Sequence, residues 1–184
     1  GTDLEVFVAS YSPAPRMVIF GAIDFSAALC KAGKLLGFHV TVVDAREIFA
    51  TRKRMPDADE VVVDWPHRWL DSQTIDSRTV ICVLTHDPKF DVPALKSAVA
   101  TKAAYIGAMG SRRTHEDRVI RLKEAGLTDE EIARIHSPIG LDLGARTPEE
   151  TAISIAAEIV QSRWGGSGKA LTKSDGPIHA GAPR

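Results

Sequence analysis

Short apolar runs alternate with longer amphipathic stretches along the chain. The continuous apolar runs predict buried strands at residues 16–20, 40–43, 61–63, 79–84 and 103–106. After the first run, apolar residues recur with helical spacing from Phe25 to Leu36, and Gly37 supplies a stop. Strand, helix and strand in this order form a βαβ unit, whose crossover should be right-handed.

The second half of the chain continues the alternation with predicted helices at about 92–100 and 114–125, and a shorter one opened by a capping box at 128–131. The strongest helix start follows, because Thr147 is an N-cap residue, Pro148 suits the first helical position and two glutamates come next. Its apolar stripe, which should dock on the sheet, comprises Ala152, Ile153, Ala156, Ile159 and Val160. The pattern predicts an α/β fold, a Rossmann-like, doubly wound, mostly parallel sheet flanked by helices, with strand order 3-2-1-4-5.

The length of 184 residues suits one domain. We expect a candidate edge strand and a proline-containing linker at 1–15, the Rossmann-like domain at 16–163, and a mobile tail rich in glycine, serine, alanine and proline at 164–184. The chain begins at Gly1 without a methionine, which suggests a processed product or a fragment of a longer protein.

Charge and composition limit the classes of binding partner that we expect. The formal net charge of -1 gives no reason to expect nucleic acid or an anionic membrane as a partner. No apolar run approaches the roughly 18 residues of a membrane span. Cys30 and Cys82 lie far apart in apolar segments and are interpreted as small buried hydrophobic residues, which fits a reducing cytoplasm.

The segment from Gly107 to Arg113 is the best candidate binding site. A short apolar strand runs through Gly107 and Gly110 to Ser111 and then to Arg112 and Arg113 at a helix start. Arginines there lose about 0.3–1 kcal/mol each against the helix macrodipole. A bound phosphate, with charge-assisted hydrogen bonds of about 1.5–3 kcal/mol each, would offset this loss. An alternative capping box, with Thr114 as N-cap, would leave both arginines in the preceding loop.

Thr85, His86 and Asp87 place a hydroxyl, an imidazole and a carboxylate together at the end of a predicted strand. They are candidates for proton transfer or for hydrogen bonds to a ligand. Because Asp-Pro is also an ordinary turn, they could instead make the loop rigid. In the expected strand order, the turns at 21–24, 85–87 and 107–113 line one crevice, with 140–146 beside it.

The turn after the first strand resembles a dinucleotide-binding turn. Gly21 and Ala22 follow the strand, and Asp44 stands where an acidic residue would bind a ribose hydroxyl. However, Ile23 occupies the position of the glycine that lets a pyrophosphate approach the backbone. NAD(P) binding is therefore the less favoured interpretation, and Asp44 could instead pair with Arg46.

The remaining histidines and the tryptophans do not predict a metal site. The histidines at 39, 67, 115, 136 and 179 lack the spacing of metal ligands. Trp65 and Trp69 could offer a stacking face, although a place in the core or in an interface is the simpler expectation.

Three segments resemble the carboxyl-terminal domain of the XdhC/CoxI family: Thr-His-Asp-Pro at 85–88, Tyr-Ile-Gly-Ala-Met-Gly-Ser-Arg-Arg at 105–113, and Pro-Ile-Gly-Leu-Asp-Leu-Gly-Ala-Arg-Thr-Pro-Glu-Glu at 138–150. The resemblance runs in order from about residue 18 to 160. It departs from the common family pattern at Ile23 and Asp24, where glycine and histidine are usual.

The resemblance implies an accessory protein that is a chaperone rather than an enzyme. It would bind the molybdenum cofactor, as molybdopterin or a nucleotide conjugate, during maturation of a molybdoenzyme of the xanthine dehydrogenase or carbon monoxide dehydrogenase type. The turn at 107–113 would then hold the cofactor's phosphate, and residues 85–87 would contact its polar part. The alternatives are an NAD(P)-dependent oxidoreductase, with Asp44 on the ribose and His86 as proton donor, and a non-catalytic interaction module that forms a homodimer or pairs with the target enzyme.

Overall fold

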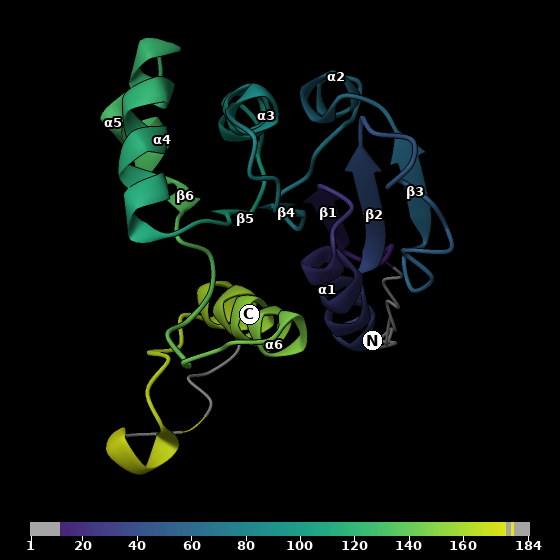
Figure 1. The fold of residues 1–184 in the computed structure, drawn as a ribbon. Coiled ribbons are helices and arrows are strands. Elements are labelled where there is room, and N and C mark those ends of the chain that lie inside the picture. Colours follow the sequence, from purple (N-terminus) through teal and green to yellow (C-terminus); the bar gives the residue numbers. More distant parts are fainter. Residues whose placement is uncertain (1–11, 176–177, 179–184) are drawn as a thin grey trace, which may run out of the picture.

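A six-stranded, fully parallel sheet forms the centre of the molecule (Figure 1). The computed structural model describes residues 12–175 and 178. The strand order is β3-β2-β1-β4-β5-β6. The strands are β1 (Arg16–Phe20), β2 (His39–Asp44), β3 (Glu60–Val63), β4 (Val80–Val83), β5 (Tyr105–Ala108) and β6 (Ile135–His136). The predicted doubly wound α/β fold and the predicted order of five strands are confirmed.

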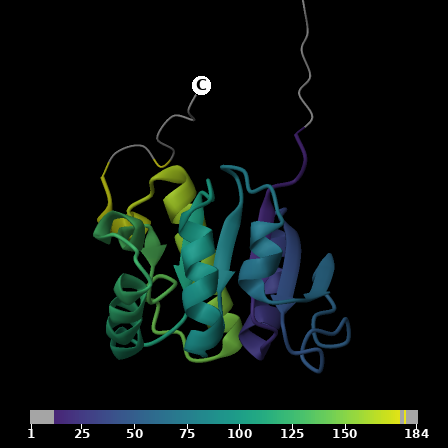
Figure 2. The same cartoon turned by 90° about the horizontal axis from the view of Figure 1, so that it is seen from above.

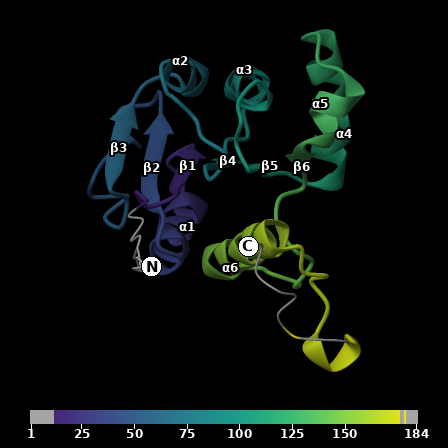
Figure 3. The same ribbon diagram turned by 180° about the vertical axis from the view of Figure 1, so that it is seen from behind.

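Helices cover both faces of the sheet. They are α1 (Asp24–Leu35), α2 (Pro66–Asp71), α3 (Pro88–Val99), α4 (Arg112–Glu124), α5 (Asp129–Ala133) and α6 (Pro148–Trp164), followed by a short 3-10 helix, η1 (Leu171–Lys173). The helices α1 and α6 lie on one face, and α2 to α5 lie on the other (Figures 1 and 3). Seen from above, α3 lies between α2 and α4 (Figure 2). None of the helices in the described part of the chain is long and apolar enough to cross a membrane.

The structure corrects several predicted boundaries. Strand β5 begins two residues later than predicted, and α3 begins at Pro88 because Asp87 caps it. Strand β6 and helix α2 were not predicted, because two and six residues are too short to show a period. Strand β6 exists through its pairing with β5, where Ile106 lies opposite Ile135. The candidate edge strand before residue 12 lies outside the described residues.

The predicted apolar stripe of α6 is only partly correct. Ala152, Ile155, Ala156 and Ile159 are buried, whereas the predicted residues Ile153 and Val160 are 55 % and 39 % exposed. The buried set follows the spacing i, i+3, i+4, i+7, so it forms one continuous face against the sheet and α1. Ile155 was left out of the prediction, and Ile153 falls one residue outside this face.

A partly buried carboxylate ties α6 to the sheet. Glu158 accepts hydrogen bonds from the Tyr105 hydroxyl at 2.5 Å and from the Gly140 N–H at 2.7 Å. Its other oxygen lies 3.2 Å from Nδ1 of His136, whose ring stacks on Tyr105. Burial by itself would raise the pKa of Glu158, but these hydrogen bonds hold it below the ordinary value. One side chain thus joins α6, β5, β6 and the loop that follows β6.

The lowered pKa of Glu158 predicts a specific pH dependence. The stabilisation is fully present above the unfolded-state pKa and is lost as the pH falls through the lower folded-state pKa. We expect Glu158→Gln to lower the free energy of unfolding by about 1–3 kcal/mol at pH 7. We also expect the variant to lose less stability than the wild type between pH 6 and pH 3, measured by chemical denaturation.

The exposed Glu149 on the same helix provides the matched control, because Glu149→Gln removes the same charge without removing these contacts. Equal pH dependence of the wild type and Glu158→Gln would contradict the assigned role.

Candidate functional site

The candidate site lies at the carboxyl ends of the strands, where β1 and β4 are neighbours. The chain leaves β1 toward α1 on one face of the sheet and leaves β4 toward α3 on the other (Figure 1). Ligands of doubly wound sheets bind at such a reversal of strand order. Gly21 brings the two turns into contact, because a Cβ built at this position would lie 3.0 Å from the Thr85 methyl group. Its φ of +102° also favours glycine.

The turn after β1 binds a side chain of the protein itself, that of Asp44. Oδ2 of Asp44 accepts a hydrogen bond from the Ala22 N–H at 2.8 Å and lies 2.6 Å from the Arg46 guanidinium. Oδ1 accepts from the backbone N–H and the Nε–H of Arg46, both at 2.9 Å. Burial would raise the pKa of Asp44, but these partners hold it below the ordinary value. The pairing of Asp44 with Arg46, which the sequence left open, is therefore present, and both carboxylate oxygens are engaged.

A buried ion pair between Asp91 and Arg118, which the sequence did not predict, holds the loop after β4. The Thr85 hydroxyl donates to Asp91, and the other oxygen of Asp91 lies 3.0 Å from the Arg118 guanidinium. Arg118 also donates to the Met109 carbonyl at 2.7 Å and to the Ser137 hydroxyl at 3.0 Å. It thereby connects the segments that follow β4, β5 and β6.

The environment of this pair is unusual for charged groups. The side chains of Arg118 and Asp91 are only 3 % and 5 % exposed. Burial raises the pKa of Asp91 to about 6, although the Arg118 guanidinium acts in the opposite sense. One sequence signal could have revealed Arg118: it stands four residues before the buried Leu122, on the inward side of its helix.

His86 and Asp87 have different surroundings. The Asp87 side chain caps α3 by accepting from the Lys89 N–H at 3.0 Å, as the loop-stiffening alternative predicts. His86 is exposed and lines a polar hollow of about 210 Å³ between α3 and α4. The hollow is also lined by Pro88, Asp91, Val92, Thr114, Asp117, Arg118 and Arg121. The structure thus brings the 85–87 segment beside the start of α4.

The start of α4 places both arginines in the helix. Ser111 is the N-cap residue and accepts from the Thr114 N–H at 3.1 Å, so the alternative with Thr114 as N-cap is wrong. Arg112 and Arg113 occupy the first two helical positions and are exposed. In residues 12–175, neither guanidinium has an ion pair, neither backbone N–H has a hydrogen-bond partner, and the first turn holds no acidic residue. Arg112 and Arg113 do not line the hollow between α3 and α4. The arginines that line it are Arg118 and Arg121.

The two glycines of this segment have separate roles. Gly107 lies inside β5, and a Cβ there would meet the Ile139 side chain at 2.5 Å, so this position is explained by packing against the loop after β6. Gly110 has a φ of +153°, and a Cβ there would lie 3.0 Å from Thr114. The turn that could meet a ligand is therefore shorter than predicted, from Met109 to Ser111.

The remaining candidate residues are accounted for by packing. The ring of Trp69 is buried and packs edge-to-face on Phe20, 6.3 Å between centroids, while that of Trp65 lies 5.1 Å from Phe90. In the described part of the chain, no group of three or more histidine, cysteine or acidic side chains could hold a metal ion.

The fold agrees with comparisons to known proteins. Residues 17–159 match the model of the XdhC Rossmann domain. The chain is 30 % identical over 159 residues to a probable xanthine dehydrogenase subunit of Bacillus subtilis, covering 86 % of this chain and 46 % of that protein. It is 28 % identical over 163 residues to the molybdenum cofactor insertion chaperone PaoD of Escherichia coli, covering 89 % and 45 %.

A solved structure shows the same arrangement. A crystal structure of a xanthine dehydrogenase from Bacillus halodurans superposes with a TM-score of 0.73 at 31 % identity, over 89 % of this chain and 46 % of that one. This chain is a Rossmann domain. It belongs to the XdhC family, and it spans less than half the length of the relatives it matches.

The Asp91–Arg118 pair gives a stability prediction. Arg118→Met leaves a buried carboxylate without its cation, so we expect the free energy of unfolding to fall by about 3–5 kcal/mol. Asp91→Leu combined with Arg118→Met removes both charges and should recover much of that loss. The measurement is urea denaturation at pH 7.5.

Arg121→Gln is the control, since the Arg121 side chain borders the hollow without a hydrogen bond or ion pair in residues 12–175, and the substitution should change stability by less than about 0.5 kcal/mol. An Arg118→Met variant as stable as Arg121→Gln would rule out the ion pair as the link between the strand ends.

Proposed function

We propose that this domain binds the molybdenum cofactor, as molybdopterin or its nucleotide conjugate, and delivers it to a molybdoenzyme of the xanthine dehydrogenase type. The cofactor is cargo in this proposal, and the domain performs no reaction on it. Membership of the XdhC family supports the proposal, as do the Bacillus and Escherichia relatives, which are named for xanthine dehydrogenase and for cofactor insertion. Because the chain covers less than half of those proteins, their whole activity is carried over only as a proposal.

The start of α4 is the observation that carries the proposal. Arg112 and Arg113 stand at the positive end of a helix with no acidic residue in the first turn, and their N–H and guanidinium groups have no partner within residues 12–175. This arrangement is unfavourable by itself. A terminal phosphate, which molybdopterin carries, supplies the missing negative charge and accepts from both kinds of donor.

The hollow between α3 and α4 fits the polar part of the same cargo. It borders Thr114, which follows the two arginines in the first turn of α4, and it presents the exposed His86 and Arg121. Thr85 and Asp87 hold the loop that carries His86, since their side chains are engaged with Asp91 and with the Lys89 N–H. In this proposal Gly110 and Ser111 shape the phosphate turn, and Gly107 supports it from within β5.

We expect Arg112→Ala combined with Arg113→Ala to weaken binding of molybdopterin at least tenfold, because two charge-assisted hydrogen bonds of about 1.5–3 kcal/mol each are lost. Thermal stability should be unchanged or slightly raised, since the arginines oppose the helix dipole. Binding is measured by anaerobic titration of the protein with the free cofactor.

Lys31→Ala combined with Lys102→Ala removes the same charge from exposed positions outside α4 and should bind as the wild type does. If both double variants bind alike, the arginines do not hold the phosphate. If the wild type binds no pterin at all, the interaction module becomes the better account, with a homodimer or the target enzyme as partner.

The oxidoreductase alternative predicts that the domain binds NADH. A dinucleotide would need the Ala22 N–H and the Asp44 carboxylate, which are hydrogen-bonded to each other, and it would meet the Ile23 side chain. We therefore expect no enhancement of NADH fluorescence on addition of the protein. Tight NADH binding that is lost in Asp44→Ala would favour the oxidoreductase.

A further inference from the structure

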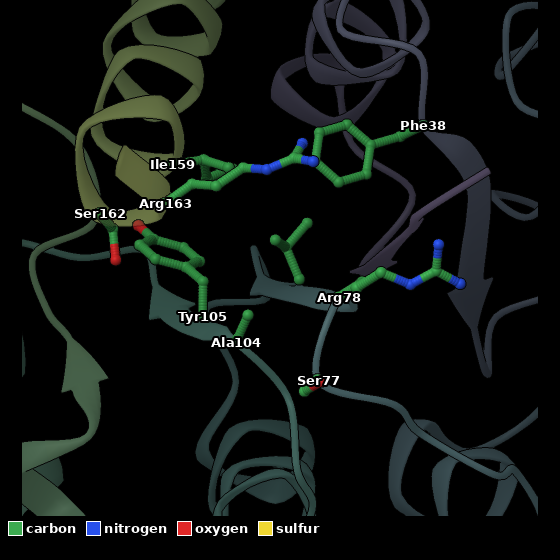
Figure 4. Close-up of a pocket in the computed structure, with 9 residues that line it drawn as sticks. Phe38, Ser77, Arg78, Ala104, Tyr105, Ile159, Ser162 and Arg163 are labelled. Carbon is green, nitrogen blue, oxygen red and sulfur yellow. The ribbon is translucent and has the colours of Figure 1, made fainter. Parts of the chain in front are cut away.

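A second pocket opens at the opposite edge of the sheet, where the strands begin. It is a cavity of about 80 Å³ beneath the last turn of α6 (Figure 4). Its walls are Phe38, Val80, Ala104, Tyr105 and Ile159. Four of these, all except Ala104, are less than 5 % exposed, so the walls belong to the core. A cavity with such walls favours an apolar group.

The mouth of this pocket is polar and carries positive charge. It is formed by Ser77, Arg78, Ser162 and Arg163. Arg78 is already engaged, because it lies 3.3 Å from Asp76 and donates to the Pro13 carbonyl at 3.0 Å. Its guanidinium points away from the cavity (Figure 4). The Tyr105 hydroxyl is likewise bound to Glu158.

Arg163 differs from these groups because its side chain has no ion-pair partner in the described part of the chain. Among residues 12–175 and 178, no carboxylate lies within ion-pair distance of it, and the Ser77 and Ser162 hydroxyls make no hydrogen bond. Its side chain extends across the mouth of the cavity in Figure 4.

We propose that this pocket binds a small apolar group that carries a carboxylate. The apolar body enters the cavity between Phe38, Val80 and Ile159, and the carboxylate accepts hydrogen bonds from Arg163 and from the free serine hydroxyls. The cavity volume limits the body to a few carbon atoms. A short branched carboxylic acid has this chemistry, and so does an apolar C-terminal residue of a polypeptide. The site is independent of the proposed cofactor site, which lies at the other edge of the sheet.

The probe is 4-methylpentanoate, which has the side chain and carboxylate of leucine without the amine. We expect it to shift the NMR signals of the Trp164 indole and the Arg163 Nε–H, since the Arg163 guanidinium carbon lies 4.9 Å from the centre of the Trp164 ring. For a ligand of this size we expect a dissociation constant on the order of 1 mM. The uncharged 4-methylpentanamide and the small acetate ion should each bind about tenfold more weakly, because each lacks one of the two recognised parts.

Two variants and one control test the assignment. Arg163→Gln should weaken 4-methylpentanoate about tenfold or more, and Ala104→Leu should block the cavity. Arg68→Gln removes a likewise exposed charge from α2 and should bind as the wild type does. Equal binding to Arg163→Gln and wild type, or no binding to the wild type at millimolar concentrations, would overturn the proposal.

A pentapeptide ending in leucine distinguishes the sources of the ligand. If the peptide competes with 4-methylpentanoate and its C-terminally amidated form does not, the pocket takes a protein C-terminus. If only the free acid binds, it takes a small carboxylic acid. Both results support the site, and neither bears on cofactor binding, which the α4 variants test.

Discussion

The loops at the carboxyl edge depend on one buried ion pair. Arg118 reaches from the middle of α4 to Asp91, to the Met109 carbonyl and to Ser137. Without it, the segments after β4, β5 and β6 would have no common partner, because the strands themselves are only two to four residues long. Two charges removed from water are tolerated only when their hydrogen bonds are satisfied, and each bond of Arg118 goes to a different element. The position of the Met109–Ser111 turn therefore follows from a buried contact made in the middle of α4.

A partly buried carboxylate has a similar role on the other face. Glu158 fixes α6 to Tyr105, His136 and Gly140, and so holds the loop after β6 against the sheet. Ile139 of this loop fills the space beside Gly107. The resemblance to the family includes this loop, yet its most evident role in the structure is packing. Residues that belong to a recognisable motif can thus serve the scaffold as much as the ligand.

Much of the fold could be predicted from the chain, and the reasons are local. The buried strands are continuous apolar runs, and Thr147 with Pro148 marks a helix start that needs no tertiary contact to be recognised. The interactions that build the site were less accessible. Nothing in the local sequence says that Asp44 bonds to Ala22 across 22 residues or that Arg118 meets Asp91 across 27. Gly107 was placed in a turn because glycine suggests one, whereas its neighbour in space is a side chain from a distant loop.

The hydrogen bond between Asp44 and the turn after β1 has a consequence for ligand selectivity. Asp44 supplies a negative group to the very N–H that the phosphates of a dinucleotide would use, and Arg46 neutralises it. An ordinary nucleotide would have to displace an intramolecular anion before gaining any contact there. Such a turn is less favourable to a nucleotide phosphate than one whose N–H groups have no partner inside the protein.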